Sequence, residues 1–125
     1  MKNVILIIEN YSRLRKTVRA LLEKNISGLA IKEANNGKTG IVKAVREKAE
    51  IVVLDIMLPD MHGLDVVKKI KEKIPKVKIV LLTMCARESI CKGDTTGTTT
   101  AVKKSEIFEK LIPAINKYLK KGKRQ

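Results

Sequence analysis

Short aliphatic runs dominate the pattern of hydrophobic and polar positions along the chain. Three of them, residues 4–8, 51–54 and 77–82, consist almost entirely of Val, Ile and Leu. Such runs are typical of strands that are buried on both faces of a sheet. Residues 29–33 alternate between apolar and polar, as an edge strand does, and residues 99–102 are rich in β-branched side chains. The pattern therefore predicts five strands.

Apolar residues at helical spacing fill the segments between these runs. Ser12 and Ser105 are expected to cap the first and last helices. Residues 40–48 and 64–73 form two more helices, and residues 87–90 a short one that leads into a loop. The side chains expected to face inward are Leu14, Val18, Leu21 and Leu22, then Ile41, Val42 and Val45, then Val66, Val67 and Ile70, and finally Ile107, Leu111, Ile112, Ile115 and Leu119. Strands alternating with helices predict an α/β fold, a doubly wound five-stranded parallel sheet with helices on both faces.

Length and composition limit the class of protein. A chain of 125 residues with 44% hydrophobic content is expected to form one domain. No apolar run approaches the roughly 20 residues of a membrane span, and residues 4–8 are too short for a secretory signal. Cys85 and Cys91 have no metal-binding companions, which favours reduced thiols. These features indicate a cytoplasmic protein without membrane insertion.

The formal net charge of +14 suggests anionic partners. The basic residues are nevertheless spread over several predicted helices, as solvated helix faces would be. Only the tail, residues 120–125, contains a compact basic cluster. Because the chain has only three aromatic residues, it offers almost no stacking platform for single-stranded nucleic acid. The sequence thus argues against nucleic acid as a specific partner and leaves only a weak contact through the tail.

Polar residues stand directly after four predicted strands. Glu9 and Asn10 follow the first predicted strand, Asp55 follows the third, and Thr83 follows the fourth. Lys103 ends the fifth predicted strand. The carboxyl ends of strands in an open parallel sheet form the crevice where ligands bind. These side chains are therefore candidates for one common site.

The segment that follows Asp55 has the pattern D-x-x-x-P-x-x-x-G, with Pro59 and Gly63 in the turn. This pattern resembles the phosphorylation-site loop of the receiver domain of two-component response regulators, such as chemotaxis receivers. The similarity covers residues 4–119, with the other polar strand ends in the same order. It implies a flavodoxin-like strand order 2-1-3-4-5, a receiver domain over residues 1–119 and a separate basic tail.

The resemblance also implies a role for each candidate residue. Asp55 would be the phosphoacceptor, Thr83 would contact the phosphoryl group, and Lys103 would pair with it. Magnesium would be bound by Glu9, Asn10, Asp55 and the backbone carbonyl of Met57. The chemistry is consistent with these roles, because an aspartate that attacks phosphorus needs a cation and a metal ion to offset the repulsion between two anions. Oxygen ligands suit Mg²⁺.

Several positions depart from the family pattern. Asn10 stands where a second acid is usual, which predicts weaker binding of Mg²⁺. Met84 replaces a small residue after Thr83, Thr100 stands where an aromatic switch residue is common, and Lys104 replaces a proline. His62 is expected to face solvent rather than to bind a ligand. These departures affect the switch mechanism more than the fold.

Three functions follow from the sequence. The first is a phosphoacceptor signalling domain, not an enzyme in the usual sense, that receives its phosphoryl group from a sensor histidine kinase or a phosphotransfer protein and binds a downstream target protein. The second is a pseudo-receiver, a protein-interaction module that works without phosphorylation. The third is a module that contacts nucleic acid through the tail. A flavin-binding protein is disfavoured, because no phosphate-cradling loop follows the first predicted strand.

Overall fold

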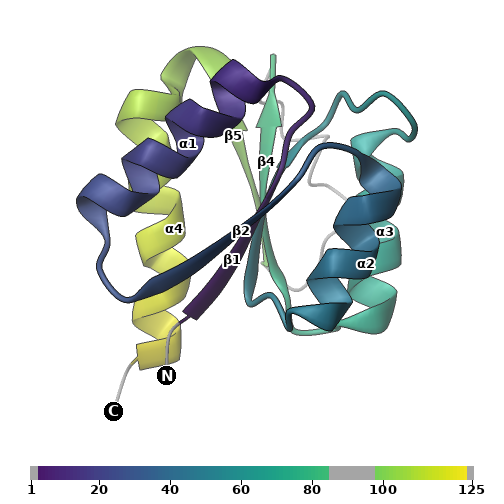
Figure 1. Ribbon diagram of the computed structural model, residues 1–125. Helices are drawn as coiled ribbons and strands as arrows, with labels where there is room; N and C mark the ends of the chain where they lie inside the picture. The colour runs from purple at the N-terminus through teal and green to yellow at the C-terminus, as the bar shows by residue number, and fades with distance from the viewer. Residues whose placement is uncertain (1–2, 85–97, 124–125) are drawn as a thin grey trace.

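Five parallel strands form a single sheet in the order β2-β1-β3-β4-β5 (Figure 1). The structure is a computed structural model and describes residues 3–84 and 98–123, with side chains up to residue 119. The strands are β1 (Asn3–Ile8), β2 (Leu29–Ala34), β3 (Ile51–Asp55), β4 (Lys78–Thr83) and β5 (Thr99–Lys103). The predicted fold class and strand order are confirmed.

Two layers of helices cover the sheet (Figure 1). One face carries α1 (Ser12–Asn25) and α4 (Ile107–Lys123), and the other carries α2 (Gly37–Arg46) and α3 (Gly63–Lys73). The short helix and most of the loop predicted for residues 87–100 lie in residues 85–97, outside the described part of the chain. Within the described part, no helix has both the length and the hydropathy of a membrane span.

The core divides into two halves because side chains alternate along each strand. Ile7, Val53 and Leu82 pack toward α1 and α4, whereas Ile8 and Leu54 pack toward α2 and α3. All five of these side chains are fully buried. Since β1 and β3 are covered on both faces, their sequences are continuous aliphatic runs, and this burial is the main source of stability.

Neither serine predicted as an N-cap has that role. Ser12 is the first residue of α1, and the capping position belongs to Tyr11, whose side chain forms no capping hydrogen bond. Ser105 lies inside a 3₁₀ turn, η2 (Lys104–Glu106), that precedes α4. Both predictions assigned the cap from residue type, although the local backbone decides which residue becomes the cap.

The helix α2 starts three residues earlier than predicted and buries a different face. The side chain of Asn36 accepts a hydrogen bond from the Thr39 amide at 2.9 Å and caps the helix at Gly37. The prediction that Val42 and Val45 face inward was wrong, because they are 58% and 43% exposed. The buried stripe consists of Gly37, Gly40, Ile41 and Ala44, whose spacing of three, one and three residues is helical. Glycine and alanine carry little hydrophobic signal, so this stripe was missed.

Candidate functional site

Strand register brings Glu9 beside Asp55. Ile8 of β1 pairs with Leu54 of β3, so the next residue of each strand lies next to the other at the carboxyl edge of the sheet. Both residues share the face of Ile7 and Val53, which is covered by α1 and α4. Both carboxylates are completely buried. The fold therefore places two acids side by side where water cannot solvate them.

Asp55 is held by the loop that follows it and by a lysine at the start of η2, directly after β5. Its Oδ1 accepts a hydrogen bond from the amide of Met57 at 2.9 Å. The ammonium of Lys104 lies 2.7 Å from Oδ2 and forms an ion pair, although its direction is not that of an aligned hydrogen bond. One side of the carboxylate is thus fixed by the backbone, and the other faces a cation.

The cation at Asp55 is Lys104, and the prediction that Lys103 supplies it is corrected. Lys103 pairs with Thr83 in the sheet register, whereas Val102 pairs with Leu82, the residue that also pairs with Asp55. Alternation along β5 therefore directs Lys103 to the opposite face from Asp55, while the turn at Lys104 continues on the correct face. With this shift, Ala101 and not Thr100 stands three residues before the pairing lysine, and Ser105 follows it.

Glu9 experiences the strongest electrostatic perturbation in the site. Burial, together with contact with the Asp55 carboxylate, raises the pKa of Glu9 from 4.5 to about 7. Its Oε2 accepts a hydrogen bond from the amide of Tyr11 at 3.0 Å, and Arg15 donates to its backbone carbonyl oxygen at 2.8 Å. Glu9 Oε1 has no hydrogen-bond partner among the residues that the structure describes. An unsatisfied buried carboxylate oxygen is costly, so the site favours a bound cation or a proton.

The remaining predicted site residues lie around this pair. Thr83 ends β4 and is buried, whereas Asn10 is exposed. Met57 follows Asp55 by two residues and has an exposed side chain, and Met84 is 74% exposed at the same edge. The structure thus brings together Glu9, Asp55, Lys104 and the loop at Met57, and it turns Asn10 outward.

The donor set fits a hard divalent cation such as Mg²⁺. Glu9 Oε1 and Asp55 Oδ2 are buried oxygens without aligned hydrogen-bond donors in the described part of the chain. Mg²⁺ commonly uses one or two carboxylates and keeps several waters. Across residues 3–84 and 98–123, no three His, Cys, Asp or Glu residues gather as a metal-binding cluster, which argues against a closed zinc site there. With Lys104 included, the three charged groups sum to −1 when both acids are ionised.

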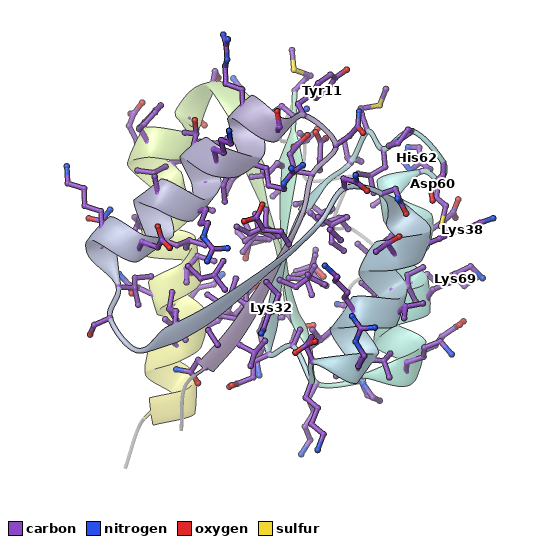
Figure 2. The ribbon with its side chains drawn as sticks, viewed as in Figure 1. Tyr11, Lys32, Lys38, Asp60, His62 and Lys69 are labelled. Carbon is purple, nitrogen blue, oxygen red and sulfur yellow. The ribbon has the colours of Figure 1, made fainter. Side chains whose placement is uncertain are left out.

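The loop after Asp55 is anchored at two further points. The amide of Gly63 donates to the Ile56 carbonyl oxygen at 2.8 Å, and a Cβ atom at Gly63 would lie only 2.5 Å from Ile56 Cα. Asp60 reaches across to α2, where its two carboxylate oxygens accept from the amides of Gly37 and Lys38 at 2.8 and 2.9 Å (Figure 2). These backbone hydrogen bonds lower the pKa of Asp60. The loop is therefore fastened to both α2 and its own strand.

His62 lies in the loop between β3 and α3. His62 is exposed and accepts a hydrogen bond from the amide of Leu64 at 3.1 Å, so it caps α3 (Figure 2). The prediction that it faces solvent is confirmed, and its capping role was not anticipated. Tyr11, whose amide donates to Glu9, has a side chain that is 63% exposed.

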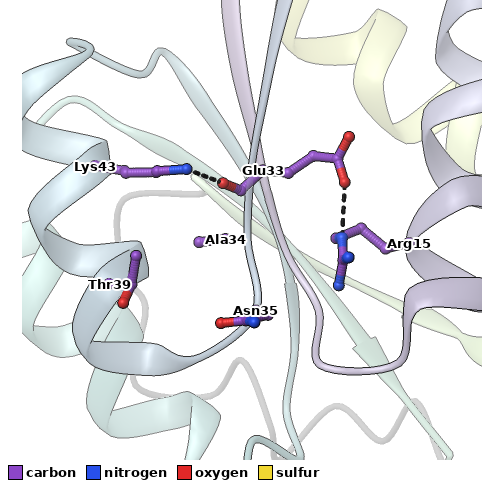
Figure 3. Close-up of a pocket in the computed structure, with 6 residues that line it drawn as sticks. All are labelled: Arg15, Glu33, Ala34, Asn35, Thr39 and Lys43. Carbon is purple, nitrogen blue, oxygen red and sulfur yellow. Dashed lines mark hydrogen bonds and ion pairs between the residues drawn. The ribbon is translucent and has the colours of Figure 1, made fainter.

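A cavity of about 230 Å³ lies next to the site, between α1, β2 and α2 (Figure 3). Its ionic side chains are linked through Glu33. Glu33 pairs with Arg15 at 2.7 Å and with Arg19 at 2.8 Å, and Lys43 donates to the Glu33 carbonyl oxygen at 2.6 Å. Burial alone would raise the pKa of Glu33, but hydrogen bonds from both arginines outweigh it and lower that pKa. This network positions Arg15, which in turn holds Glu9 by donating to its backbone carbonyl oxygen.

Comparison with known proteins agrees with this geometry. Residues 5–116 match the family model described as the response regulator receiver domain. The chain is 32% identical over 118 residues to the probable transcriptional regulatory protein TcrX of Mycobacterium tuberculosis, which covers 94% of this chain and 50% of that protein. It is 35% identical over 81 residues to the transcriptional regulatory protein YdfI of Bacillus subtilis, which covers 65% of this chain and 38% of that protein. The chain spans half or less of the length of these relatives.

Solved structures show the same fold. A two-component response regulator of the LuxR family from Aurantimonas superimposes with a TM-score of 0.84 at 25% identity, covering 99% of this chain and 89% of that one. The chemotaxis response regulator CheY4 of Vibrio cholerae superimposes with a TM-score of 0.81 at 21% identity, covering 94% of this chain and 99% of that one. The second comparison supports the fold alone.

Proposed function

Because the chain belongs to the response regulator receiver domain family, we propose that Asp55 accepts a phosphoryl group in the cytoplasm and that this changes a protein-interaction face. The donor would be the phosphohistidine of a sensor histidine kinase or a phosphotransfer protein. The recipient of the change would be a downstream target protein. Residues 1–119 would carry this function, with residues 120–125 as a separate basic tail.

In the proposed reaction, a carboxylate oxygen of Asp55 attacks the phosphorus atom of the donor. A new O–P bond forms while the P–N bond of the phosphohistidine breaks, and the histidine nitrogen leaves with the electron pair. Lys104, 2.7 Å from Asp55 Oδ2, supplies a fixed positive charge beside the incoming phosphoryl oxygens. Thr83 lies at the end of the next strand and is proposed to donate a hydrogen bond to the phosphoryl group.

The metal-binding residues are proposed to be Glu9, Asp55 and the carbonyl group of Met57. A bound Mg²⁺ neutralises charge between the carboxylates and the phosphoryl group. Asn10 is exposed, so any contribution from its amide oxygen requires a change of side-chain conformation. We therefore expect Mg²⁺ binding that is weaker than in receivers with two acids after the first strand, because one unit of negative charge is absent.

The observation that carries this proposal is the cluster of two buried carboxylates, Glu9 and Asp55, with the partly buried Lys104. Burying two carboxylates costs several kcal/mol unless charges compensate each other. The structure tolerates this arrangement with one lysine for two acids and leaves Glu9 Oε1 unsatisfied among the described residues. A purely structural role would not require such an arrangement at the edge where strands end.

A second function is a phosphorylation-independent pseudo-receiver. Asn10 favours it, because an amide replaces a second acid after β1 and its exposed position keeps the amide oxygen away from the metal site. In this case, the Lys104–Asp55 pair would be a permanent structural contact and the fold a constitutive protein-interaction module. The chain would then bind its partner protein whether or not Asp55 is phosphorylated.

Acetyl phosphate separates the two functions. The chain is incubated with acetyl phosphate and MgCl₂, and its intact mass is measured. We expect one phosphoryl adduct that disappears in the Asp55→Asn variant and without Mg²⁺, and that decays slowly by hydrolysis. No adduct at high Mg²⁺, in a chain shown to be folded by circular dichroism, would contradict phosphoacceptance and favour the pseudo-receiver.

A further inference from the structure

The edge of the sheet opposite Asp55 contains a groove rimmed by lysines. It has a volume of about 480 Å³ and lies between the α2–β3 and α3–β4 connections, where the ends of α2 and α3 are side by side (Figure 1). Four lysines line it, namely Lys48, Lys73, Lys76 and Lys78. Glu50 is its only acidic lining residue, which leaves a net formal charge of +3 in this lysine groove.

These charges are not compensated within the described part of the chain. No carboxylate described there forms an ion pair with any of the four lysines. The Glu50 carboxylate instead accepts a hydrogen bond from the amide of Val4 at 3.3 Å. By contrast, Glu33 forms ion pairs with Arg15, which lines the cavity of Figure 3, and with Arg19. Uncompensated like charges around one hollow favour an anionic ligand.

The floor of the lysine groove is apolar. Val45 is 43% exposed on it, and Ile74 is partly buried. Val45 was predicted to face inward and is instead exposed on this surface. An occupant that covers the floor would remove apolar surface from water, which a purely ionic ligand cannot do.

We propose that the lysine groove binds an acidic peptide segment of a partner protein, with an aliphatic side chain on Val45 and carboxylates toward the lysines. Charge complementarity selects an anion, and the apolar floor selects a peptide over a nucleic-acid backbone, which presents phosphates and sugars. The groove lies at the amino ends of the strands, so this binding is separate from the proposed phosphorylation of Asp55.

The test uses the full ¹⁵N-labelled chain and a synthetic probe. The probe is a blocked ten-residue peptide of glutamates with two central leucines, titrated while amide chemical shifts are recorded. We expect shifts confined to residues 45–50 and 73–78. The same peptide with serines in place of leucines should bind about threefold or more weakly, because its contact with the floor is lost.

Variants distinguish a defined site from general attraction to a basic protein. Lys73→Glu/Lys76→Glu should weaken binding of the leucine peptide about tenfold or more, since two attractive charges become repulsive. Lys16→Glu/Lys69→Glu changes the net charge equally at exposed positions outside the groove and should have a much smaller effect. Equal weakening by both variants, or shifts spread over the whole surface, would overturn the proposal. Displacement of the peptide by a 16-base-pair DNA duplex with shifts at the same amides would assign the groove to nucleic acid instead.

Discussion

Replacing Glu9 with glutamine should change how the stability of the protein depends on pH. In the folded chain, burial and the contact with Asp55 raise the pKa of Glu9 from 4.5 to about 7. Between these two values, the folded state holds a proton that the unfolded state has released. The contribution of this proton to stability is complete below pH 4.5 and is lost as pH rises through about 7. Glutamine keeps the size of the side chain and cannot ionise.

The size of the effect follows from the interval between the two pKa values. At about 1.4 kcal/mol for each pH unit, the interval from 4.5 to about 7 corresponds to about 3 kcal/mol. Part of this loss has already occurred at pH 5. Between pH 5 and pH 8, the free energy of unfolding of the native chain should therefore fall by about 2 kcal/mol or slightly more relative to the Glu9→Gln variant.

Urea unfolding followed by circular dichroism at pH 5, 6, 7 and 8 measures this difference. Glu72→Gln, a substitution of an exposed glutamate on α3, serves as the control and should follow the native chain. Excess Mg²⁺ should reduce the pH dependence of the native chain, because a bound cation favours ionised Glu9. If the free energy of unfolding depended on pH in the same way for the native chain and Glu9→Gln, the pKa of Glu9 would not be raised in the folded state.

Three further substitutions test the site. Lys104→Ala should lower the free energy of unfolding by about 3 kcal/mol, as expected when an ion pair with a buried carboxylate loses one partner, and should reduce phosphorylation at least tenfold. Lys103→Ala should change the free energy of unfolding by less than about 0.5 kcal/mol. A larger effect of Lys103→Ala than of Lys104→Ala would restore Lys103 as the site cation. Gly63→Ala should lower the free energy of unfolding by about 3 kcal/mol, since the added Cβ meets the Ile56 backbone. Gly40→Ala should lower it by about 1 kcal/mol, because the added Cβ meets only the side chain of Ile8, which can shift more easily than a backbone. Equal losses in urea unfolding would contradict this distinction. Asp60→Ala should cost about 1 kcal/mol at pH 7 by removing two hydrogen bonds to the first amides of α2, in addition to those of the N-cap Asn36. Because the pKa of Asp60 is lowered, this cost should vanish as pH falls below 3.8, and a cost that persists in acid would argue against the cap.

The strands could be predicted from the sequence because β1 and β3 are buried on both faces. That environment requires uninterrupted aliphatic residues, and few other structures produce them. The inward face of α2 could not be predicted in the same way. Close contact between Gly40 and Ile8 leaves little room for a side chain there, and three of the four buried residues of α2 are glycine or alanine, which hydropathy patterns overlook.

Side-chain alternation along β5 decides whether Lys103 or Lys104 pairs with Asp55. Both lysines follow the same short strand, and the resemblance to receivers was applied to the first. Alternation from Val102, which packs with Leu82, would have selected the residue two positions later. The same alternation explains why Thr99 contacts Lys71 of α3 while Thr100 contacts Tyr118 of α4. Face assignment from a buried neighbour was therefore the missing step.

The position of both proposed sites follows from the topology of the sheet. In a doubly wound parallel sheet, every helix runs opposite to the strands, so all helix C-termini gather at the edge where the strands begin. Cations are favoured there by the helix dipoles, and α3 ends with Lys71 and Lys73 in its last turn. The acids stand at the other edge, separated by the length of β3, about 17 Å. The lysine groove opens to solvent, where charges are largely screened beyond about 8 Å, so the two sites should influence each other mainly through a change in the structure between them.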